Sequence, residues 1–409
     1  MRGSLGPLGE RRFAWYFASR FSDTLGTMMA GIALAFAVLE ITDSATALGQ
    51  VLAAHTIPMV LLMLFGGVIA DRFPRNLLEQ ASNLAAAVTQ GLLAALVITD
   101  RAELWMVMVL AALNGAVDAI NFPAQASMVP QLVPAAQLQS ANALISMSRG
   151  ALSVVAPTLS ALLVVGAGPG WALAANAGTW LLAALLLVPV TLPARAPREE
   201  RTSMLQELAE GWDLFRRTTW LWVIVLGFGF LNAIHVGAWF TLGPVVAKDT
   251  IGEQGWGFVL SAESAGLLLA TVLLLRLRLR RPLLVGMLGC SLLSVPLAVL
   301  GVAPELGLLM VTAFVAGAGI EVFSIGWNLA MQENVEERML SRAYSYDALG
   351  SYVAMPVGQL VYGPLGDAFG TRDVLLWSAV AFAVISLLTL ASRSVRTLDR
   401  PLDPSGAPG

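Results

Sequence analysis

Ionisable side chains inside long apolar segments are the residues of this sequence whose type and position suggest chemistry. Asp23 and Arg149 each lie near the middle of such a segment, and Asp118 and Glu321 lie further along two others. A charged side chain at the centre of a bilayer costs at least about 2.5–3.5 kcal/mol, so such residues are rare unless they serve a function. Protons, ions and polar substrates are the ligands that they would bind.

The other reactive side chains exclude several kinds of site. His55 and His235 are the only histidines, they lie far apart in the sequence, and Cys290 is the only cysteine. We therefore expect neither a disulfide framework nor a metal site built from Cys and His ligands. The sequence also has no Gly-x-x-x-x-Gly-Lys-Ser/Thr loop for ATP hydrolysis, and we expect no cofactor.

The segments that hold these residues are long enough to cross a membrane. Of the 409 residues, 57% are hydrophobic and 12% charged, and the mean hydropathy is +0.74, well above that of a soluble domain. A helix that spans a bilayer needs roughly 20 apolar residues. The sequence thus predicts an all-α integral membrane protein with twelve spans, at 13–40, 46–70, 76–99, 102–124, 139–166, 170–192, 217–247, 255–275, 282–302, 305–331, 341–367 and 372–392.

Basic residues are distributed unevenly between the loops on the two sides of these spans. If the N-terminus is cytoplasmic, the outer loops hold only Arg101, Lys248 and Arg372, and nearly all other Lys and Arg residues fall in inner loops. Positive charge is retained on the cytoplasmic side of membrane proteins. This predicts a multi-pass protein of the plasma (inner) membrane with both termini in the cytoplasm.

A polar connection divides the chain into two halves. Residues 193–216 separate a six-helix bundle in residues 1–192 from another in residues 217–392. Within the connection, SMLQELAEGWDLFRR has apolar residues at helical spacing, which predicts an interfacial helix on the cytoplasmic side. Residues 393–409 form a cytoplasmic tail whose last part, DRPLDPSGAPG, has a composition typical of disorder.

The two halves share a weak internal repeat. Asp118 in NGAVDAINFPAQASMVPQL aligns with Glu321 in AGAGIEVFSIGWNLAMQENV, and the same offset aligns Met128 with Met331. An acid at the same depth of the fourth span of each half indicates two pseudo-symmetric bundles. Internal repeats of this kind are typical of secondary transporters.

A motif between the second and third spans resembles a known family. Residues 67–75 read GVIADRFPR, which is similar to the signature G-x-L-A-D-R-x-G-R-K of the major facilitator superfamily and departs from it at Pro74 and Asn76. Ala156-Pro157 resembles a degenerate form of the family's antiporter motif, without its glycines. The resemblance extends over about residues 12–395 and is greatest to the drug/proton antiporter branch that includes macrolide-efflux and siderophore-export proteins. It implies the major facilitator fold.

The resemblance also implies a gate on the cytoplasmic side. In the family, the Asp and the second Arg of the motif form a charge cluster with an acid at the inner end of the fourth span, which here implies Asp71, Arg75 and Asp118. Together with Gly67 and Arg72, these residues are expected to hold the two halves together on the inner side in the outward-open state.

Proton coupling is expected at the charges near mid-membrane. The first and fifth spans are neighbours in the family, so Asp23 and Arg149 are expected to pair, with protonation of Asp23 releasing Arg149. The alternative is a static ion pair that only fixes packing, with Arg20, one helical turn away, as the other partner of Asp23.

Four further acids have less specific predictions. Glu321 is either a second proton site or part of a latch with the arginines at 280–281. Glu263 and Asp347 are cavity acids that would attract cationic substrates or residues that reach an interface. Glu79 is expected to reach the interface.

Substrate contacts are predicted from the spans that line the family's cavity, the first, fourth, seventh and tenth. Apolar and aromatic cavities suit amphipathic ligands. The candidates in these spans are Met28, Asn121, Asn232, Phe323 and Trp327.

These observations predict a secondary active transporter that exports hydrophobic or amphipathic small molecules by alternating access, in exchange for protons. Export of an endogenous metabolite such as a siderophore is the alternative. A membrane-embedded enzyme or a channel is disfavoured, because the sequence shows neither a cluster of His, Asp or Ser near an interface nor a filter loop. The expected partners are the small-molecule substrate, protons and the lipid bilayer, with no nucleic acid, and the expected state is a monomer.

Overall fold

A computed structural model describes residues 6–72, 74–125, 128–134, 137–191, 212–213, 215–274, 277 and 279–398. All regular elements in these residues are helices. The helices of the first half are η2 (Gly6–Gly9), α1 (Arg11–Thr42), α2 (Ala45–Arg72), α3 (Arg75–Ile98), α4 (Leu104–Gln125), α5 (Val129–Leu132), α6 (Leu138–Ala167) and α7 (Pro169–Leu187).

The helices of the second half are interrupted more often. They are α9 (Thr219–Ile234), the π-helical η4 (His235–Leu242), α10 (Gly243–Asp249), α11 (Gly252–Leu274), α12 (Pro282–Ser291), α13 (Ser294–Val302), α14 (Leu306–Asn334), α15 (Glu337–Tyr352), α16 (Met355–Phe369), α17 (Thr371–Thr389) and α18 (Arg393–Arg396).

Two breaks in this half coincide with prolines. Pro296 lies four residues after Leu292, which directly follows α12, and Pro356 lies four residues after Tyr352, the last residue of α15. Proline has no backbone N–H, so it cannot donate the helical hydrogen bond to the carbonyl four residues earlier. Each pair of helices therefore continues one span with a local interruption.

The predicted fold class is confirmed. In the described part of the chain, ten helices are long and apolar enough to cross a membrane, and Leu104–Ala119 is a shorter apolar helix. The remaining predicted span corresponds to α15 and α16, which are separate helices. Each of the twelve predicted segments thus coincides with a helix or with helices that follow one another directly.

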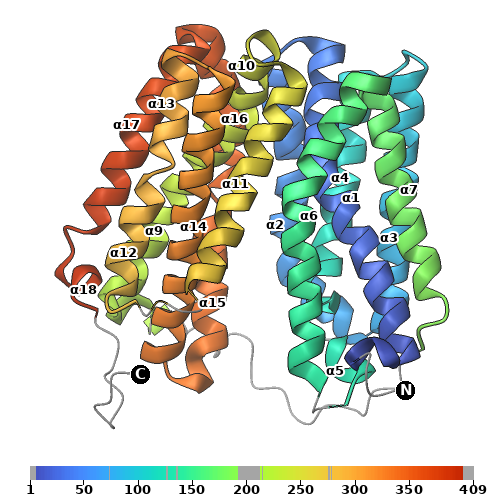
Figure 1. Cartoon of the computed structure of the whole chain (residues 1–409), viewed down its shortest axis with the longest axis horizontal. Coiled ribbons are helices and arrows are strands. Elements are labelled where there is room, and N and C mark those ends of the chain that lie inside the picture. The colour runs from blue at the N-terminus through green and yellow to red at the C-terminus, as the bar shows by residue number, and fades with distance from the viewer. Residues whose placement is uncertain are drawn as a thin grey trace. The chain divides into compact units, whose positions relative to one another are not determined.

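The chain forms two compact units (Figure 1). Unit 1 consists of Met1–Arg198, Ala247–Ser261 and Gln359–Pro364, and unit 2 of Glu199–Val246, Ala262–Gly358 and Leu365–Gly409. In unit 1, α2 packs on α4, and α7 packs on both α1 and α3. In unit 2, α12 packs on α14, and α13 packs on α17. The division into bundles at 1–192 and 217–392 stays a prediction.

The two units repeat one close contact between helices. At Gly115 of α4, an added Cβ would collide with the carbonyl oxygen of His55 in α2, and at Gly317 of α14 one would collide with the carbonyl of Glu263 in α11. Only glycine allows backbones to approach in this way. Asp118 and Glu321 follow these glycines by about one helical turn, so the internal repeat seen in the sequence has a structural counterpart.

The connection and the tail are described only in part. Trp212, Asp213 and residues 215–217 are helical, and the rest of the predicted interfacial helix lies outside the described residues. In the tail, α18 is helical and the description ends at residue 398.

Candidate functional site

Asp23 lies in α1 and forms an ion pair with Arg20 of the same helix. The distance from Arg20 Nη1 to Asp23 Oδ2 is 2.7 Å, and the Asp23 side chain is buried. Arg20 is the alternative partner considered from the sequence, whereas Arg149 is exposed on α6. The structure therefore favours the pair within α1, and a role for Arg149 in proton coupling stays a prediction.

Hydrogen bonds to α7 place α1 and α3 at the same level. Ser19 of α1 donates through Oγ to the carbonyl of Ala183 (2.8 Å), and Gln80 of α3 donates through Nε2 to the carbonyl of Ala184 (3.2 Å). Ala183 and Ala184 are consecutive residues of one helix. The residues next to these donors, Arg20 and Glu79, are thus held at neighbouring heights of unit 1.

Glu79 is fully buried in α3. Its side chain is 0% exposed, and neither carboxylate oxygen has a hydrogen-bond partner among the described residues. The charged side chains that interact with it electrostatically are Arg20 and Asp23, and the Tyr16 hydroxyl, also buried, is another neighbour. The prediction that Glu79 reaches the interface is wrong, because the start of α3 packs against α7 instead of facing the headgroups.

A second pair of side chains, His55 and Asp118, joins α2 and α4. His55 Nε2 lies 3.0 Å from Asp118 Oδ2, and the two side chains are 31% and 47% exposed. His55 was not singled out as a site residue in the sequence, since nothing there gives its distance from α4. Its carbonyl lies against Gly115, and this close approach of the helices brings His55 within reach of Asp118.

The pair lines a cavity of about 220 Å³ inside unit 1. Apolar walls come from residues such as Leu34, Leu52 and Leu93, and polar groups from Thr27 of α1, Gln90 of α3 and Asn114 of α4. Two hydrogen bonds order the polar side: Thr89 Oγ1 donates to Asn114 Oδ1 (2.6 Å), and Asn114 Nδ2 donates to Gln90 Oε1 (3.3 Å). Apolar walls with a few fixed polar groups are typical of small-molecule sites.

The predicted cytoplasmic gate is described only at its edges. Gly67, Asp71 and Arg72 belong to the last turns of α2, where side-chain placement lies outside the described structure. Arg75 begins α3 and is half-buried, and Asp118 has His55 as its observed partner. His55 is about 25 Å along α2 from Arg72, at 1.5 Å per residue. The gate at the motif stays a prediction, and the observed contact places Asp118 at the cavity.

Three acids in the spans of unit 2, Glu263, Glu321 and Asp347, accept hydrogen bonds from neutral donors. Trp239 Nε1 donates to Glu263 (3.0 Å), Thr271 Oγ1 to Glu321 (2.9 Å) and Trp327 Nε1 to Asp347 (2.9 Å). The observed partner of Glu321 is thus a hydroxyl and not one of the arginines at 280–281. In the described residues, no group of three or more His, Cys, Asp or Glu side chains is placed to hold a metal ion.

The predicted substrate contacts lie in different surroundings. Phe323 and Trp327 are buried in an aromatic cluster of unit 2, where the Phe228 and Phe323 rings stack at 4.2 Å between centroids. Asn232 donates through Nδ2 to a backbone carbonyl of α15, and Met28 is half-buried on α1. The side chain of Asn121 in α4 lies outside the described structure. Contact of these residues with a substrate stays a prediction.

Sequence comparison identifies the family of this helical chain. The profile of the Major Facilitator Superfamily matches residues 16–358. The chain belongs to the major facilitator superfamily. This member of the superfamily is a membrane transporter and not an enzyme, in agreement with the relatives described next.

Two relatives are efflux proteins, and a solved transporter shares the fold. Macrolide efflux protein A of Streptococcus pyogenes is 21% identical over 395 residues, covering 95% of this chain and 97% of that protein. Multidrug efflux pump Tap of Mycolicibacterium fortuitum is 22% identical over 388 residues, covering 91% and 93%. The crystal structure of a bacterial homologue of the human lysosomal transporter Spinster superposes with a TM-score of 0.73 at 15% identity, covering 96% of this chain and 99% of the other.

Proposed function

We propose that this transporter exports amphipathic cationic small molecules across the plasma membrane in exchange for protons, by alternating access. The observation that carries the proposal is the group of charged side chains on α1 and α3, in which Arg20 pairs with Asp23 at 2.7 Å and the nearby Glu79 is fully buried without a hydrogen-bond partner among the described residues. With both acids ionised, these three described side chains carry a net negative charge in an interior where an uncompensated charge is costly. Binding one proton removes that charge.

Glu79 is the group that we expect to exchange the proton. Asp23 keeps a short contact with Arg20, whereas neither oxygen of Glu79 has a hydrogen-bond partner in the described part of the chain. This refines the prediction made for Asp23 from the sequence. In the proposal, Asp23 and Arg20 set the charge around Glu79, and Glu79 carries the proton.

The cavity in unit 1 would receive the charged end of the substrate. At about 220 Å³ it is smaller than the 300–1,000 Å³ that encloses a drug-sized ligand, so it fits one end of an amphipathic molecule. Asp118 is the acid at this cavity and is about half exposed. A cationic group would donate a charge-assisted hydrogen bond to the Asp118 carboxylate, while the apolar part of the molecule lies against leucines.

The two ligands would be coupled through α1. Asp23 is one turn, about 6 Å, before Thr27 at the cavity. At Gly26, between them, α1 packs so closely on α7 that an added Cβ would collide with Thr179, and Asn176 Nδ2 donates to the Gly26 carbonyl (2.6 Å). A change of charge at the cluster therefore acts on a short and tightly packed piece of helix that also borders the cavity.

The proposal also includes the direction of transport and the side of the membrane on which the termini lie. Export is supported by the efflux relatives, and a cytoplasmic position for both termini is supported by the basic loops. The motif residues Asp71, Arg72 and Arg75 would then form the cytoplasmic gate, and a monomer contains all the parts that the mechanism needs.

The test is transport of a fluorescent cationic dye such as ethidium in inverted membrane vesicles. An inside-acid gradient should drive dye into vesicles that contain the wild type, and a protonophore should abolish the accumulation. Asp118→Asn should weaken it, whereas Glu103→Gln, which changes an exposed acid at the end of a loop, should not. Absence of pH-driven dye movement in the wild type would contradict the proposal.

A further inference from the structure

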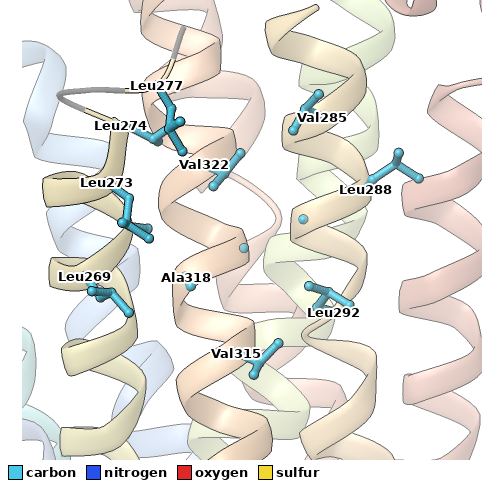
Figure 2. A pocket seen from close by; sticks show the side chains of 13 residues that line it. Leu269, Leu273, Leu274, Leu277, Val285, Leu288, Leu292, Val315, Ala318 and Val322 are labelled. Carbon is cyan, nitrogen blue, oxygen red and sulfur yellow. The ribbon is translucent and has the colours of Figure 1, made fainter. Parts of the chain in front are cut away.

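An apolar groove runs along the surface of unit 2 between α11, α12 and α14 (Figure 2). Its volume is about 460 Å³, and all of its lining residues are Leu, Val, Ala or Gly. Leu273, Leu288 and Val315, one from each helix, are between 45% and 49% exposed. The groove therefore lies on the outer surface of these helices and is not part of the packed core.

Small residues at the floor create the groove. An added Cβ at Gly289 of α12 or at Gly319 of α14 would come into close contact with the backbone of the other, so the two helices meet through their backbones. Ala318 lies beside this contact, and Val322 and Val315 lie one turn away in either direction (Figure 2). The larger side chains form walls on both sides of a low floor.

Two arginines lie at one end of the groove. Leu277 and Val285 both line it, and Arg280 and Arg281, which are exposed, lie between them in the sequence. The N–H of Val285 donates to the carbonyl of Arg281 (3.1 Å), so Arg281 is one helical turn from the lining.

The length of the groove matches one leaflet of a bilayer. Arg281 and Leu292 flank α12 at its two ends, and Leu292 is the lining residue of this segment that lies furthest from Arg281. At 1.5 Å per residue, the distance between them is about 16 Å. Half of a hydrocarbon core of about 30 Å is close to this value. A charged group at one end and an apolar groove of this length match the head group and the acyl chain of one phospholipid.

We propose that this groove is a binding site for a phospholipid with an anionic head group. One acyl chain lies along the floor at Ala318 and Gly319, between the walls from α11 and α12, and the phosphate contacts Arg280 and Arg281. Basic groups beside clefts between transmembrane helices favour anionic lipids in this way. The site is separate from the cavity of about 220 Å³ and from the charged side chains of α1 and α3 used in the proposed function, both of which belong to unit 1.

Lipid retention measured by native mass spectrometry tests the proposal. The purified full chain is mixed in mild detergent with equal amounts of phosphatidylglycerol and phosphatidylcholine that have identical acyl chains. The wild type should retain phosphatidylglycerol several-fold more than phosphatidylcholine. Arg280→Gln and Arg281→Gln should each lower the retention of phosphatidylglycerol roughly fivefold, because each arginine contributes about that factor.

A second variant tests the groove itself. Ala318→Phe should fill the floor and reduce the retention of both lipids. Arg101→Gln, at an exposed arginine elsewhere, and Val380→Phe, on the exposed apolar face of α17, are the matched controls and should behave as the wild type. Equal retention of the two lipids by the wild type would overturn the anionic preference, and unchanged retention by Ala318→Phe would overturn the location.

Discussion

Acidic side chains in the spans of the two units have different kinds of partner. In unit 1, Asp23 is paired with Arg20 and Asp118 with His55. Arginine is always charged, and histidine can become charged. Glu79 adds a second carboxylate near Arg20 without a hydrogen bond in the described structure. Unit 1 therefore contains groups whose net charge changes when one proton binds.

In unit 2 the described donors to the corresponding acids are neutral. The hydrogen bonds join Trp239 to Glu263, Thr271 to Glu321, and Trp327 to Asp347. Such a donor stabilises the position of the acid, and a neutral amide at the same place can accept the same bond. Asp118 and Glu321 thus occupy corresponding places in the two halves but have different hydrogen-bond partners. We therefore expect proton binding and release to take place in unit 1.

Removal of the cation from the unit 1 cluster should have the largest effect. Arg20→Gln removes the positive partner that Asp23 has in the described structure, and breaking a buried pair in this way costs about 3–5 kcal/mol. The thermal unfolding midpoint in detergent should fall markedly. Arg149→Gln, at an exposed position, is the control and should unfold like the wild type. Equal midpoints for both variants would show that Arg20 does not balance the buried acids.

Loss of the proposed proton carrier should abolish coupling. Glu79→Gln keeps the shape of the side chain and cannot exchange a proton, so pH-driven dye accumulation should fall at least tenfold while dye still equilibrates down its own gradient. Vesicle transport with and without a pH gradient separates the two. Wild-type accumulation in this variant would transfer the coupling role to another acid, with Asp23→Asn as the next test.

Neutralising the cavity acid should weaken substrate binding. Asp118→Asn removes one charge-assisted hydrogen bond, worth about 1.5–3 kcal/mol, so KM for a cationic dye should rise at least about tenfold. Transport of an uncharged analogue should change little, and this comparison is the control. A similar change for both substrates would indicate a structural role for the pair with His55.

Replacing an acid of unit 2 by its amide should have the smallest effect. In Glu263→Gln the amide oxygen can still accept from Trp239, so pH-driven transport should stay within about twofold and stability within about 1 kcal/mol. Trp239→Phe, which leaves Glu263 without this donor, should destabilise by about 1–3 kcal/mol. If Glu263→Gln uncoupled transport as strongly as Glu79→Gln, the difference between the units would be lost.

Composition and hydropathy were sufficient to predict an all-α membrane protein, and the major facilitator fold was predicted from the resemblance of the motif at residues 67–75. Twelve apolar segments of sufficient length left few alternatives, because a membrane admits only helices or closed barrels. Prolines alone did not predict the interruptions of the helices. Pro296 and Pro356 accompany breaks, whereas Pro58, Pro157 and Pro364 lie inside uninterrupted helices.

The site was harder to predict because it depends on which helix faces meet. Glu79 is near the start of its span, and such a residue normally reaches the interface. The signal that was missed is the polar stripe of α3, in which Asn76, Asn83 and Gln90 recur with Glu79 at helical spacing. A polar stripe on a membrane helix indicates a face turned towards the protein. The pairing of His55 with Asp118 depends on the close approach of α2 and α4 at Gly115, and no pattern in the sequence indicated that approach.

Proton release on substrate binding tests the central claim most directly. Purified transporter in weakly buffered detergent solution is mixed with the cationic dye, and the change in pH is recorded with a pH-sensitive fluorophore. The wild type should release about one proton per chain as the dye binds, and Glu79→Gln should bind the dye without releasing it. Release of the same amount by Glu79→Gln would contradict the account, because the exchanged proton would then come from a group outside the cluster of α1 and α3.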